Sequence, residues 1–451
     1  MKQGIAGQSF RKYAERNGLF FRFLETLLVE KVFSIKKHNH ELMRRIVDSE
    51  SHTTSRTVLP LHGWQSAYQL GYATALWRLP LQKDKHLIIN FGTDIPKTKM
   101  MLEDLPSGFA ISPFLNLEGE DALFIKADLH IRFDEIGEPV SESYPSTESN
   151  SAREAWENGC RNVDLVTKKD RHVNDFPANS SEEFHLQSVK EAIKAIEAGE
   201  IQKVVLSRTK HVALPASFSV TGIFERLCDK YPNAFVSLVY LPHLNQIWLG
   251  ATPETLVSVD RQGIFRTVAL AGTQSAFDAS GQMIPPKQAP WTQKEIEEQA
   301  LVSRYIISCF KKIRVREYLE EGPKTAVAGN LMHLRSDYAV DTKAINFPEL
   351  GTVMLGLLHP TSAVCGMPKL PALEFIQEHE GYDREFYSGY LGPVNIDSET
   401  HLFVNLRCMK ISNGMATLYG GGGITEDSVP EKEWQETELK CRTLLAVLEE
   451  S

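Results

Sequence analysis

Strand-like stretches that follow one another directly are the feature of this sequence that most constrains its fold. Three of them, "AFVSLVYL", "QIWLGATPETLVSVD" and "GIFRTVALAG", occupy most of residues 234–272. They are rich in β-branched and aromatic side chains, and no helical segment separates them. The regular strand–helix alternation of a Rossmann or TIM-barrel fold is therefore missing. With "LFVNLRCMKIS" and "MATLYGGG" as further strands and long helices predicted at 293–319 and 431–448, the sequence indicates an α/β or α+β architecture.

A polar loop separates two parts of the chain that differ in their sequence pattern. The segment "EPVSESYPSTESNSARE", residues 138–154, has the Ser, Pro and Glu content of an exposed loop. Beyond it, Ser180 and Glu183 form a capping-box pattern that predicts the start of a helix, and Gly199 stands where its C-cap belongs. The following stretch "IQKVVLSR" predicts a strand.

The composition limits the partners of the protein. The 451 residues carry a formal charge of -9, which does not favour nucleic acid or an anionic lipid surface. No apolar stretch approaches the roughly 18 residues of a membrane span, and the N-terminus lacks the apolar core of a signal peptide. The six cysteines are scattered without a CxxC pair, as expected of free thiols in a reducing compartment. We therefore expect a soluble cytoplasmic protein.

Two predicted helices each begin with a capping-box pattern and a pair of glutamates three residues apart. The capping residues are Thr292 and Ser428, and the pairs are Glu295 with Glu298 and Glu433 with Glu436. One such pair is ordinarily a solvated face that complements the helix dipole. Two such pairs, one of them after the glycine run "YGGGG", lead to the hypothesis of a binding site for a hard cation. Mg²⁺ prefers carboxylate oxygens and bridges to anionic substrates, while glycine amides hold a further oxyanion.

Two ionisable residues stand in apolar surroundings. Lys203 lies early in "IQKVVLSR", where alternation places it on one face with Val205 and Ser207. Burial would favour its neutral form and make it a general base; a strand-end lysine that reaches water is the alternative. Glu254 in "LGATPETLVS" would serve as a general acid if its pKa is raised, or it is an ordinary loop glutamate.

The stretch from about residue 182 to 449 resembles the chorismate-utilising enzymes, namely isochorismate synthase, salicylate synthase, anthranilate synthase component I and aminodeoxychorismate synthase component I. Ten motifs occur in matching order, among them "KVVLSR", "GATPETLV", "ALAGT", "KEIEEQALV", "LHPTSAVCGMP" and "YGGGGIT". The resemblance implies an α+β fold with two large packed antiparallel sheets and helices on the outside. It implies a divergent part, residues 1–174, that contributes strands to the same body as the catalytic region, residues 175–451.

The resemblance also implies roles for individual residues. Glu298 and Glu436 match direct Mg²⁺ ligands, and Glu295 and Glu433 match acidic neighbours that act through water. Arg407 and Tyr387 match residues that hold the enolpyruvyl carboxylate of chorismate. The other implied substrate-binding residues are Ala271, Gly272, Thr273, His333, Thr361, Gly421, Gly422, Gly423 and Lys440. From the residues alone, His333 is equally a hydrogen-bonded core histidine, and Arg407 a surface strand arginine.

Lys203 separates the branches of the resembled family, because the ammonia-using anthranilate synthases usually carry glutamine there. The lysine favours an isochorismate synthase, in which water attacks C2 of chorismate and the C4 hydroxyl leaves. Lys203 would be the base and Glu254 the acid. Salicylate synthase, which adds pyruvate elimination, is the alternative, followed by anthranilate synthase component I.

Other properties stay open at this stage. The sequence does not distinguish a menaquinone from a siderophore pathway, and the resemblance suggests a monomer or a weak homodimer. Residues 1–50, basic and aromatic-rich, are expected to form a packed helix, with a partner surface as the alternative.

Overall fold

The computed structural model describes residues 59–92, 94–144, 150–161, 179–215, 218–278, 280–328 and 331–449. All of them belong to one unit of the chain, residues 58–451. The expectation for residues 1–50 lies outside the described residues.

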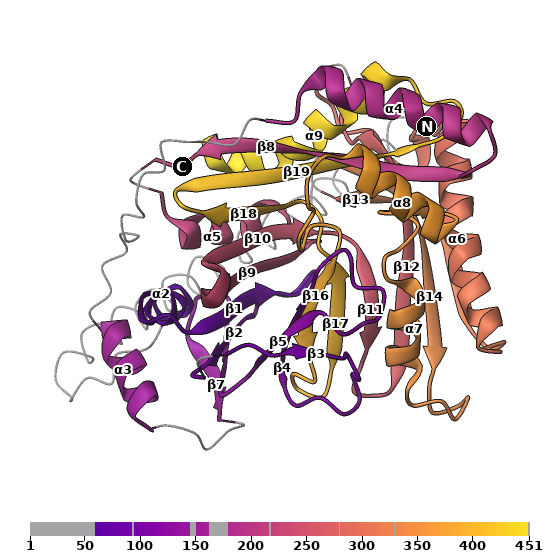
Figure 1. The fold of residues 1–451 in the computed structure, drawn as a ribbon. Helices are drawn as coiled ribbons and strands as arrows, with labels where there is room; N and C mark the ends of the chain where they lie inside the picture. The colour runs from indigo at the N-terminus through magenta and orange to yellow at the C-terminus, as the bar shows by residue number, and fades with distance from the viewer. Residues whose placement is uncertain are drawn as a thin grey trace, which may run out of the picture. The chain divides into compact units, whose positions relative to one another are not determined.

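The larger of two sheets has ten strands and carries the glycine-rich strand near one end (Figure 1). In spatial order its strands are β15 (Gly366–Met367), β8 (Lys203–Ala213), β19 (Met415–Ile424), β18 (Cys408–Ser412), β10 (Gln246–Thr252), β9 (Phe235–Leu241), β1 (Ala73–Arg78), β2 (Lys85–Asn90), β6 (Leu129–Phe133) and β7 (Pro139–Ser143). Strands from before residue 144 thus extend the same sheet as strands from after residue 200.

The second sheet has nine strands and is likewise assembled from both parts of the chain. In spatial order they are β13 (Leu319–Ala328), β14 (Leu331–Asp341), β12 (Ile264–Ser275), β11 (Thr255–Val259), β17 (Thr400–Val404), β16 (Tyr390–Val394), β4 (Gly108–Ser112), β5 (Ala122–Lys126) and β3 (Lys97–Thr98). Every strand pairing in the described part of the chain is antiparallel.

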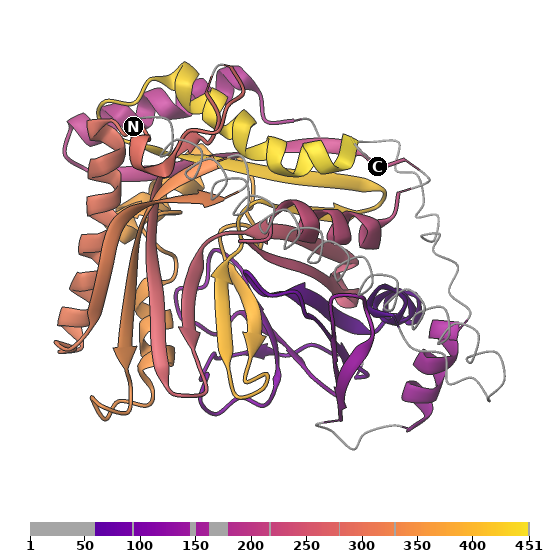
Figure 2. The ribbon, with the colours of Figure 1, turned by 180° about the vertical axis from the view of Figure 1, so that it is seen from behind.

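Helices cover the outer faces of the sheets (Figures 1 and 2). They are α2 (Pro60–Leu70), α3 (Asn150–Arg161), α4 (Glu182–Glu197), α5 (Val220–Lys230), α6 (Gln293–Lys312), α7 (Leu350–Leu358), α8 (Lys369–His379) and α9 (Pro430–Glu449), with 3₁₀ turns at Pro242–Leu244 and Pro286–Gln288. Helix α9 packs on β19 and contacts α4 and α5, while α6 packs on β12. Among the described residues, no helix combines the length and apolar character that crossing a membrane requires.

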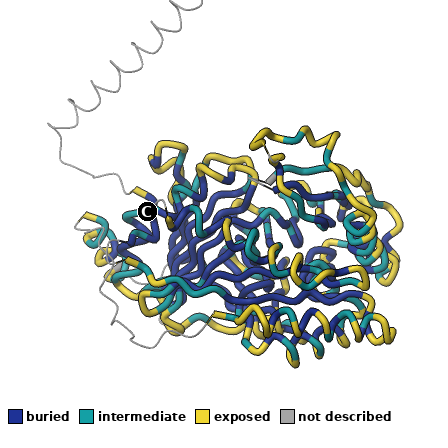
Figure 3. Tube along the Cα trace, turned by 90° about the horizontal axis from the view of Figure 1, so that it is seen from above, coloured by how far each residue is buried: buried dark blue, intermediate teal, exposed yellow. Residues whose placement is uncertain are grey.

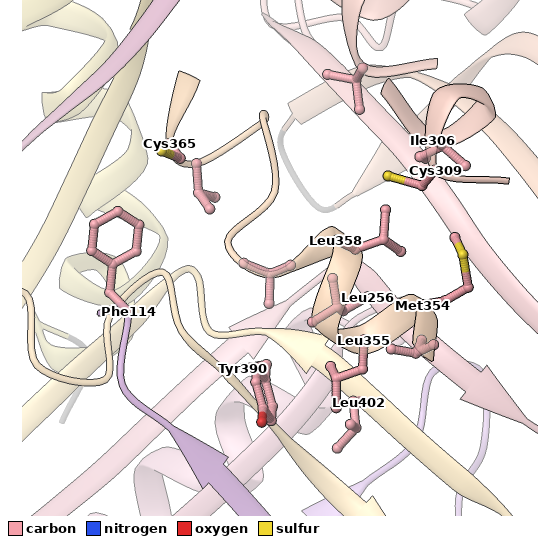
Figure 4. Close-up of a cluster of buried hydrophobic side chains, with 14 of the residues drawn as sticks. Phe114, Leu256, Ile306, Cys309, Met354, Leu355, Leu358, Cys365, Tyr390 and Leu402 are labelled. Atoms are coloured by element: carbon pink, nitrogen blue, oxygen red, sulfur yellow. The ribbon is translucent and has the colours of Figure 1, made fainter. Parts of the chain in front are cut away.

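Aromatic and aliphatic side chains fill the space between the sheets and beneath the helices, so the central strands are the most deeply buried part (Figure 3). Phe235 of the ten-stranded sheet stacks on Phe403 of the nine-stranded sheet, with ring centroids 4.1 Å apart. Leu256, Leu355 and Leu402 meet where α7 covers β11 (Figure 4). Each fully buried leucine contributes about 1.5–3 kcal/mol through the hydrophobic effect, so such clusters fix the helices on the sheets.

Two sequence expectations about helix ends are wrong. The helix predicted at 293–319 ends at Lys312, because Arg314 adopts a left-handed conformation with φ 60° and Leu319 begins β13. The capping residue of α4 is Ser181, whose side chain accepts a hydrogen bond from the amide of Phe184; Ser180 contacts Thr209 instead.

The other predictions about helix ends hold at α4 and α6, and in part at α9. Gly199 follows the end of α4 with φ 77°, as predicted. The Glu295 carboxylate accepts the amide hydrogen of Thr292 at 2.7 Å, which confirms the capping box of α6. At α9, Pro430 occupies the first turn as expected, but the Ser428 hydroxyl accepts from the amide of Thr425 within the preceding turn.

Candidate active site

Two predicted strands break where the chain passes from one sheet to the other. "QIWLGATPETLVSVD" forms β10 in the ten-stranded sheet and β11 in the nine-stranded sheet, with Glu254 at the corner. "LFVNLRCMKIS" likewise forms β17 and β18, with Arg407 at the corner in a left-handed conformation of φ 48°. The corners lie side by side, because the amide of Val404 donates to the Glu254 carbonyl and that of Ala251 to the Arg407 carbonyl, each at 3.0 Å.

Glycines in β19 let neighbouring elements approach the strand closely. A Cβ atom on Gly420 would lie 2.7 Å from the Thr437 carbonyl oxygen, so glycine permits α9 to pack directly on β19. A Cβ atom on Gly421 would lie 3.0 Å from the hydroxyl of Tyr387. Tyr387 is buried and stacks on Tyr419, with ring centroids 4.9 Å apart.

The next two glycines face charged side chains. A Cβ atom on Gly422 would lie 3.1 Å from Glu433 Oε2. On Gly423 it would lie 2.8 Å from Lys203 Cε and 3.3 Å from Glu298 Oε1. The glycine run is therefore a floor on which carboxylates and an ammonium group converge, and any larger residue would displace them.

One edge of this glycine segment faces away from β8. Gly421 pairs with Ser207 of β8 in register, yet its carbonyl oxygen accepts a hydrogen bond from Lys440 Nζ at 2.7 Å. Because the N–H and C=O of one strand residue point to the same side, the Gly421 amide also lies on the edge away from β8. The predicted contact between the glycine amides and a substrate oxyanion would be made at this edge.

A cavity of about 80 Å³ opens between the two corners and the glycine floor. Eleven of the residues predicted from the sequence line it. They are Lys203, Glu254, Ala271, Gly272, Thr273, Glu298, His333, Arg407, Gly423, Glu436 and Lys440. The remaining predicted residues lie outside this lining, namely Thr361, Tyr387, Gly421, Gly422, Glu295 and Glu433.

Glu254 and Lys203 are both buried in this cavity, at 5% and 3% exposure. Burial raises the pKa of Glu254 to about 7, against the opposing influence of the Lys203, Arg407 and Lys440 cations. A carboxyl group with that pKa carries its proton for a substantial fraction of the time at neutral pH, as a general acid requires.

His333 is held as a neutral imidazole with a defined tautomer. Burial, together with the nearby Arg407 cation, lowers its pKa to about 3. Its Nδ1 lies 2.9 Å from the carbonyl oxygen of Gly272, which can only accept, so Nδ1 carries the proton. Nε2 is then an acceptor. Gly272 has φ 67°, a conformation that favours glycine at the bulge in β12.

The carboxylates on α9 are compensated by lysines. Glu436 forms an ion pair with Lys440 at 2.6 Å. Burial works to raise the pKa of Glu436, but the Lys440 cation outweighs it and the pKa is lowered. Glu433, only 2% exposed, pairs with Lys294 of α6 at 2.6 Å, and burial nevertheless raises its pKa. Lys294 also feels the charges of Glu298 and Glu436, and these carboxylates raise its pKa in spite of burial.

The carboxylate of Glu295 has other partners. Besides capping α6, it accepts hydrogen bonds from Gln274 Nε2 at 2.8 and 2.9 Å, which ties the helix to the bulged end of β12. The structure therefore uses this side chain to position α6, and its predicted part in metal binding stays a prediction.

Buried polar atoms without a hydrogen-bond partner occur at three predicted site residues. They are Arg407 Nη1, Thr361 Oγ1 and Glu433 Oε2. Each buried polar atom that stays unpaired destabilises the folded protein by about 1–3 kcal/mol, unless a ligand supplies the missing contact. The arginine and threonine suit an anionic or hydroxylated ligand, while the glutamate oxygen suits a cation.

The residues fit a Mg²⁺ ion. Carboxylates of Glu298, Glu433 and Glu436 converge on a floor that a Cβ atom would fill, and a buried carboxylate oxygen lacks a partner. Among the described residues, no group of three or more His, Cys, Asp or Glu side chains is placed to hold a metal ion by itself. Mg²⁺ does not need such a group, since it ordinarily uses one or two carboxylates, keeps several waters and bridges to substrate.

Sequence reasoning missed residues that hold the site in place. Lys294 is one, and its place four residues before Glu298 could have signalled it. Glu380 and Arg384 form another buried pair at the same spacing. Arg384 donates to the carbonyl oxygen of Val205 at 2.7 Å, and Glu380 accepts from the amide of Ser207 at 2.7 Å. This pair fixes the β8 segment that carries Lys203.

A much larger cavity lies elsewhere in the described structure. It measures about 880 Å³ and lies at the start of α4, bordered by β8, β18 and β19. None of the predicted site residues lines it, and it is more open to solvent. Size alone does not mark the site; the convergence of buried ionisable groups does.

Residues 139–449, more than half of the chain, match the protein family described as chorismate binding enzyme. The chain belongs to this family. The resemblance inferred from the ordered motifs is thereby confirmed.

Individual relatives cover part of this chorismate binding enzyme. It is 28% identical over 268 residues to the isochorismate synthase EntC of Escherichia coli (strain K12), which covers 58% of this chain and 66% of EntC. It is 29% identical over 283 residues to anthranilate synthase component 1 of Thermus thermophilus, covering 61% of this chain and 58% of that protein. The chain thus matches less than two thirds of either relative's length.

A solved structure extends the likeness to the whole fold. MenF, the menaquinone-specific isochorismate synthase from Escherichia coli, superposes with a TM-score of 0.67 over 88% of this chain and 92% of its own, at 22% sequence identity. At that identity the likeness concerns the fold alone. The predicted fold class, two large antiparallel sheets with outer helices, is confirmed.

Proposed function

We propose that this protein is an isochorismate synthase, which converts chorismate reversibly to isochorismate with the help of Mg²⁺. The observation that carries the proposal is the pairing of Lys203 with Glu254. Both are buried in one cavity, next to the carboxylates of Glu298 and Glu436. A base and a protonated acid beside a cation site are what a hydroxyl exchange on an anionic ring requires.

In its unprotonated form, Lys203 would take a proton from a water molecule as the water oxygen forms a bond to C2 of the ring. The ring double bonds shift and the bond from C4 to its hydroxyl breaks. Glu254, protonated at a pKa of about 7, would give its proton to the departing hydroxide, which leaves as water. One water enters and one leaves, and the protons on Lys203 and Glu254 are restored through solvent. Each group is expected to contribute about 10²–10⁴-fold to the rate.

Other residues of the cavity would bind and orient the substrate. Arg407 has a buried Nη1 without a partner, and its guanidinium matches the geometry of a carboxylate. The Nε2 of His333 is an acceptor for a substrate hydroxyl group. Mg²⁺, held by Glu298 and Glu436 with Glu433 nearby, would neutralise the ring carboxylate and withdraw charge from the ring.

The proposal is supported by a relative named isochorismate synthase, but an anthranilate synthase is equally similar in identity. Lys203 favours the water-using reaction, because a lysine can serve as base for water whereas the ammonia-using branch usually has glutamine at this position.

Product analysis of the purified protein with chorismate tests the proposal. With Mg²⁺ present we expect isochorismate, and starting from isochorismate we expect chorismate at the same final ratio. EDTA should stop the reaction and excess Mg²⁺ restore it. Formation of salicylate with pyruvate would assign a salicylate synthase instead, and anthranilate formed with ammonium salts would assign an anthranilate synthase. No conversion of chorismate with Mg²⁺ would refute the proposal.

A further inference from the structure

Lys294 joins the starts of the two helices that carry the acidic side chains. It lies in the first turn of α6, four residues before Glu298, and therefore on the same helical face. Its Nζ lies 2.6 Å from Glu433 Oε1 and 3.3 Å from the hydroxyl of Ser428, both near the start of α9. The lysine is thus the direct link between the two helix starts on this side of the cavity.

The ammonium group sits where the carboxylates need a cation. Glu433 is 2% exposed, and its second oxygen has no partner in the structure. The same oxygen and the carboxylate of Glu436 approach Gly422, while that of Glu298 approaches the adjoining Gly423. Leaving the buried Glu433 carboxylate without a counter-ion, beside the half-buried carboxylates of Glu298 and Glu436, would cost several kcal/mol. Lys294 supplies one positive charge, on a side chain that is 29% exposed and therefore has room to move.

We propose that the ammonium group of Lys294 is a tethered counter-ion that compensates these glutamates while no divalent ion is bound and is displaced when one binds. An ammonium group is a compact charge on a flexible stem, so it can substitute for a metal ion and withdraw. The inference rests on the proposed function for the identity of the ion, Mg²⁺. It adds that metal binding competes with an internal cation.

The competition has two consequences. In the metal-free protein Lys294 holds the starts of α6 and α9 together, and it lowers the affinity for Mg²⁺ because its ion pair with Glu433 must break first. Removing the charge should therefore strengthen metal binding and weaken the metal-free protein. A lysine that only braced the two helices would weaken the protein equally with and without metal.

Lys294→Met tests the proposal, because methionine keeps much of the apolar stem and removes the charge. Mg²⁺ affinity is measured by titration calorimetry without substrate, and the unfolding temperature is measured in EDTA and in saturating MgCl₂. We expect binding to tighten by about tenfold or more, the temperature in EDTA to fall, and the stabilisation by Mg²⁺ to grow. Lys432→Met, an exposed lysine in the first turn of α9, is the matched control and should change neither quantity.

Lys294→Arg is a second variant that keeps the charge. It should keep the metal-free stability, with Mg²⁺ affinity within about threefold of that of the wild type. Unchanged or weaker Mg²⁺ binding by Lys294→Met, or an equal loss of stability in EDTA and MgCl₂, would overturn the proposal. These readouts need no turnover, so a wrong assignment of the reaction would show in the product analysis and leave them unaffected.

Discussion

The two sides of the cavity deal with buried charge in opposite ways. On the side of α6 and α9, Glu433 and Glu436 form ion pairs with Lys294 and Lys440, each at 2.6 Å, and the Lys440 cation lowers the pKa of Glu436 in spite of burial. On the side of the sheet-crossing corners, burial suppresses charge, raising the pKa of Glu254 to about 7 and lowering that of His333 to about 3. A side built of ion pairs suits the binding of ions, and a side where burial favours the uncharged forms of a carboxyl group and an imidazole suits proton transfer.

Lys203 stands between the two sides, beside Gly423 and close enough to Glu254 to affect its pKa. Lys203→Ala should remove the base and lower turnover by about 10²–10⁴-fold. Chorismate affinity should change little, because the anchoring cations remain. Initial rates and equilibrium binding of chorismate check this. Near-normal turnover in this variant would remove Lys203 from the chemistry.

The suppressed charge of Glu254 should appear in the pH dependence of stability. Its folded-state pKa of about 7 lies above the usual 4.5, so its contribution to stability is full below pH 4.5 and is lost as the pH rises through 7. The loss amounts to about 3 kcal/mol. Glu254→Gln should lack it, so the stability difference between variant and wild type grows by that amount from pH 4.5 to 8.

Urea unfolding at the two pH values measures this difference. The exposed Glu431→Gln serves as control and should give a difference that does not depend on pH. A pH-independent difference for Glu254→Gln would mean that this carboxyl is charged in the folded protein at neutral pH.

Adding one methyl group to the glycine floor should disturb the charged side without removing a charge. In Gly423→Ala the new Cβ would lie 2.8 Å from Lys203 Cε, so the lysine must shift. Misplacement of a catalytic group by about 1 Å costs on the order of 10²-fold in turnover. Gly356→Ala in α7, where nothing lies within 4 Å, is the control and should retain full activity. Full activity in Gly423→Ala would show that the floor tolerates a side chain.

The ion-pair side should govern the response to metal. Glu436→Gln should weaken Mg²⁺ binding by at least about 10–100-fold, because loss even of a group that supports a metal ligand has that effect. The Mg²⁺ concentration that gives half-maximal turnover measures the change. Glu431→Gln should leave it unaltered. An unchanged Mg²⁺ requirement in Glu436→Gln would place the ion elsewhere.

Much of the site could be predicted from local sequence. The glutamate spacing placed Glu298 and Glu436 on helix faces that line the cavity, and strand alternation placed Lys203 on a buried face. Glu295 differs, because its carboxylate is already engaged by the capping hydrogen bond from Thr292 and by the side chain of Gln274. Sequence spacing does not reveal which of two glutamates on one face finds a nearer donor.

By itself, the sequence determined the elements and the chemistry they carry, because helical spacing, strand alternation and capping residues act over a few neighbours. The tertiary structure alone decided how those residues meet. The breaks at Glu254 and Arg407 read as continuous strands in the sequence, and only the packing of two sheets makes the chain cross between them there. Lys294 pairs with Glu433, which lies 139 residues further along the chain. The charge state of each group follows from such distant contacts, since burial and neighbouring ions set its pKa.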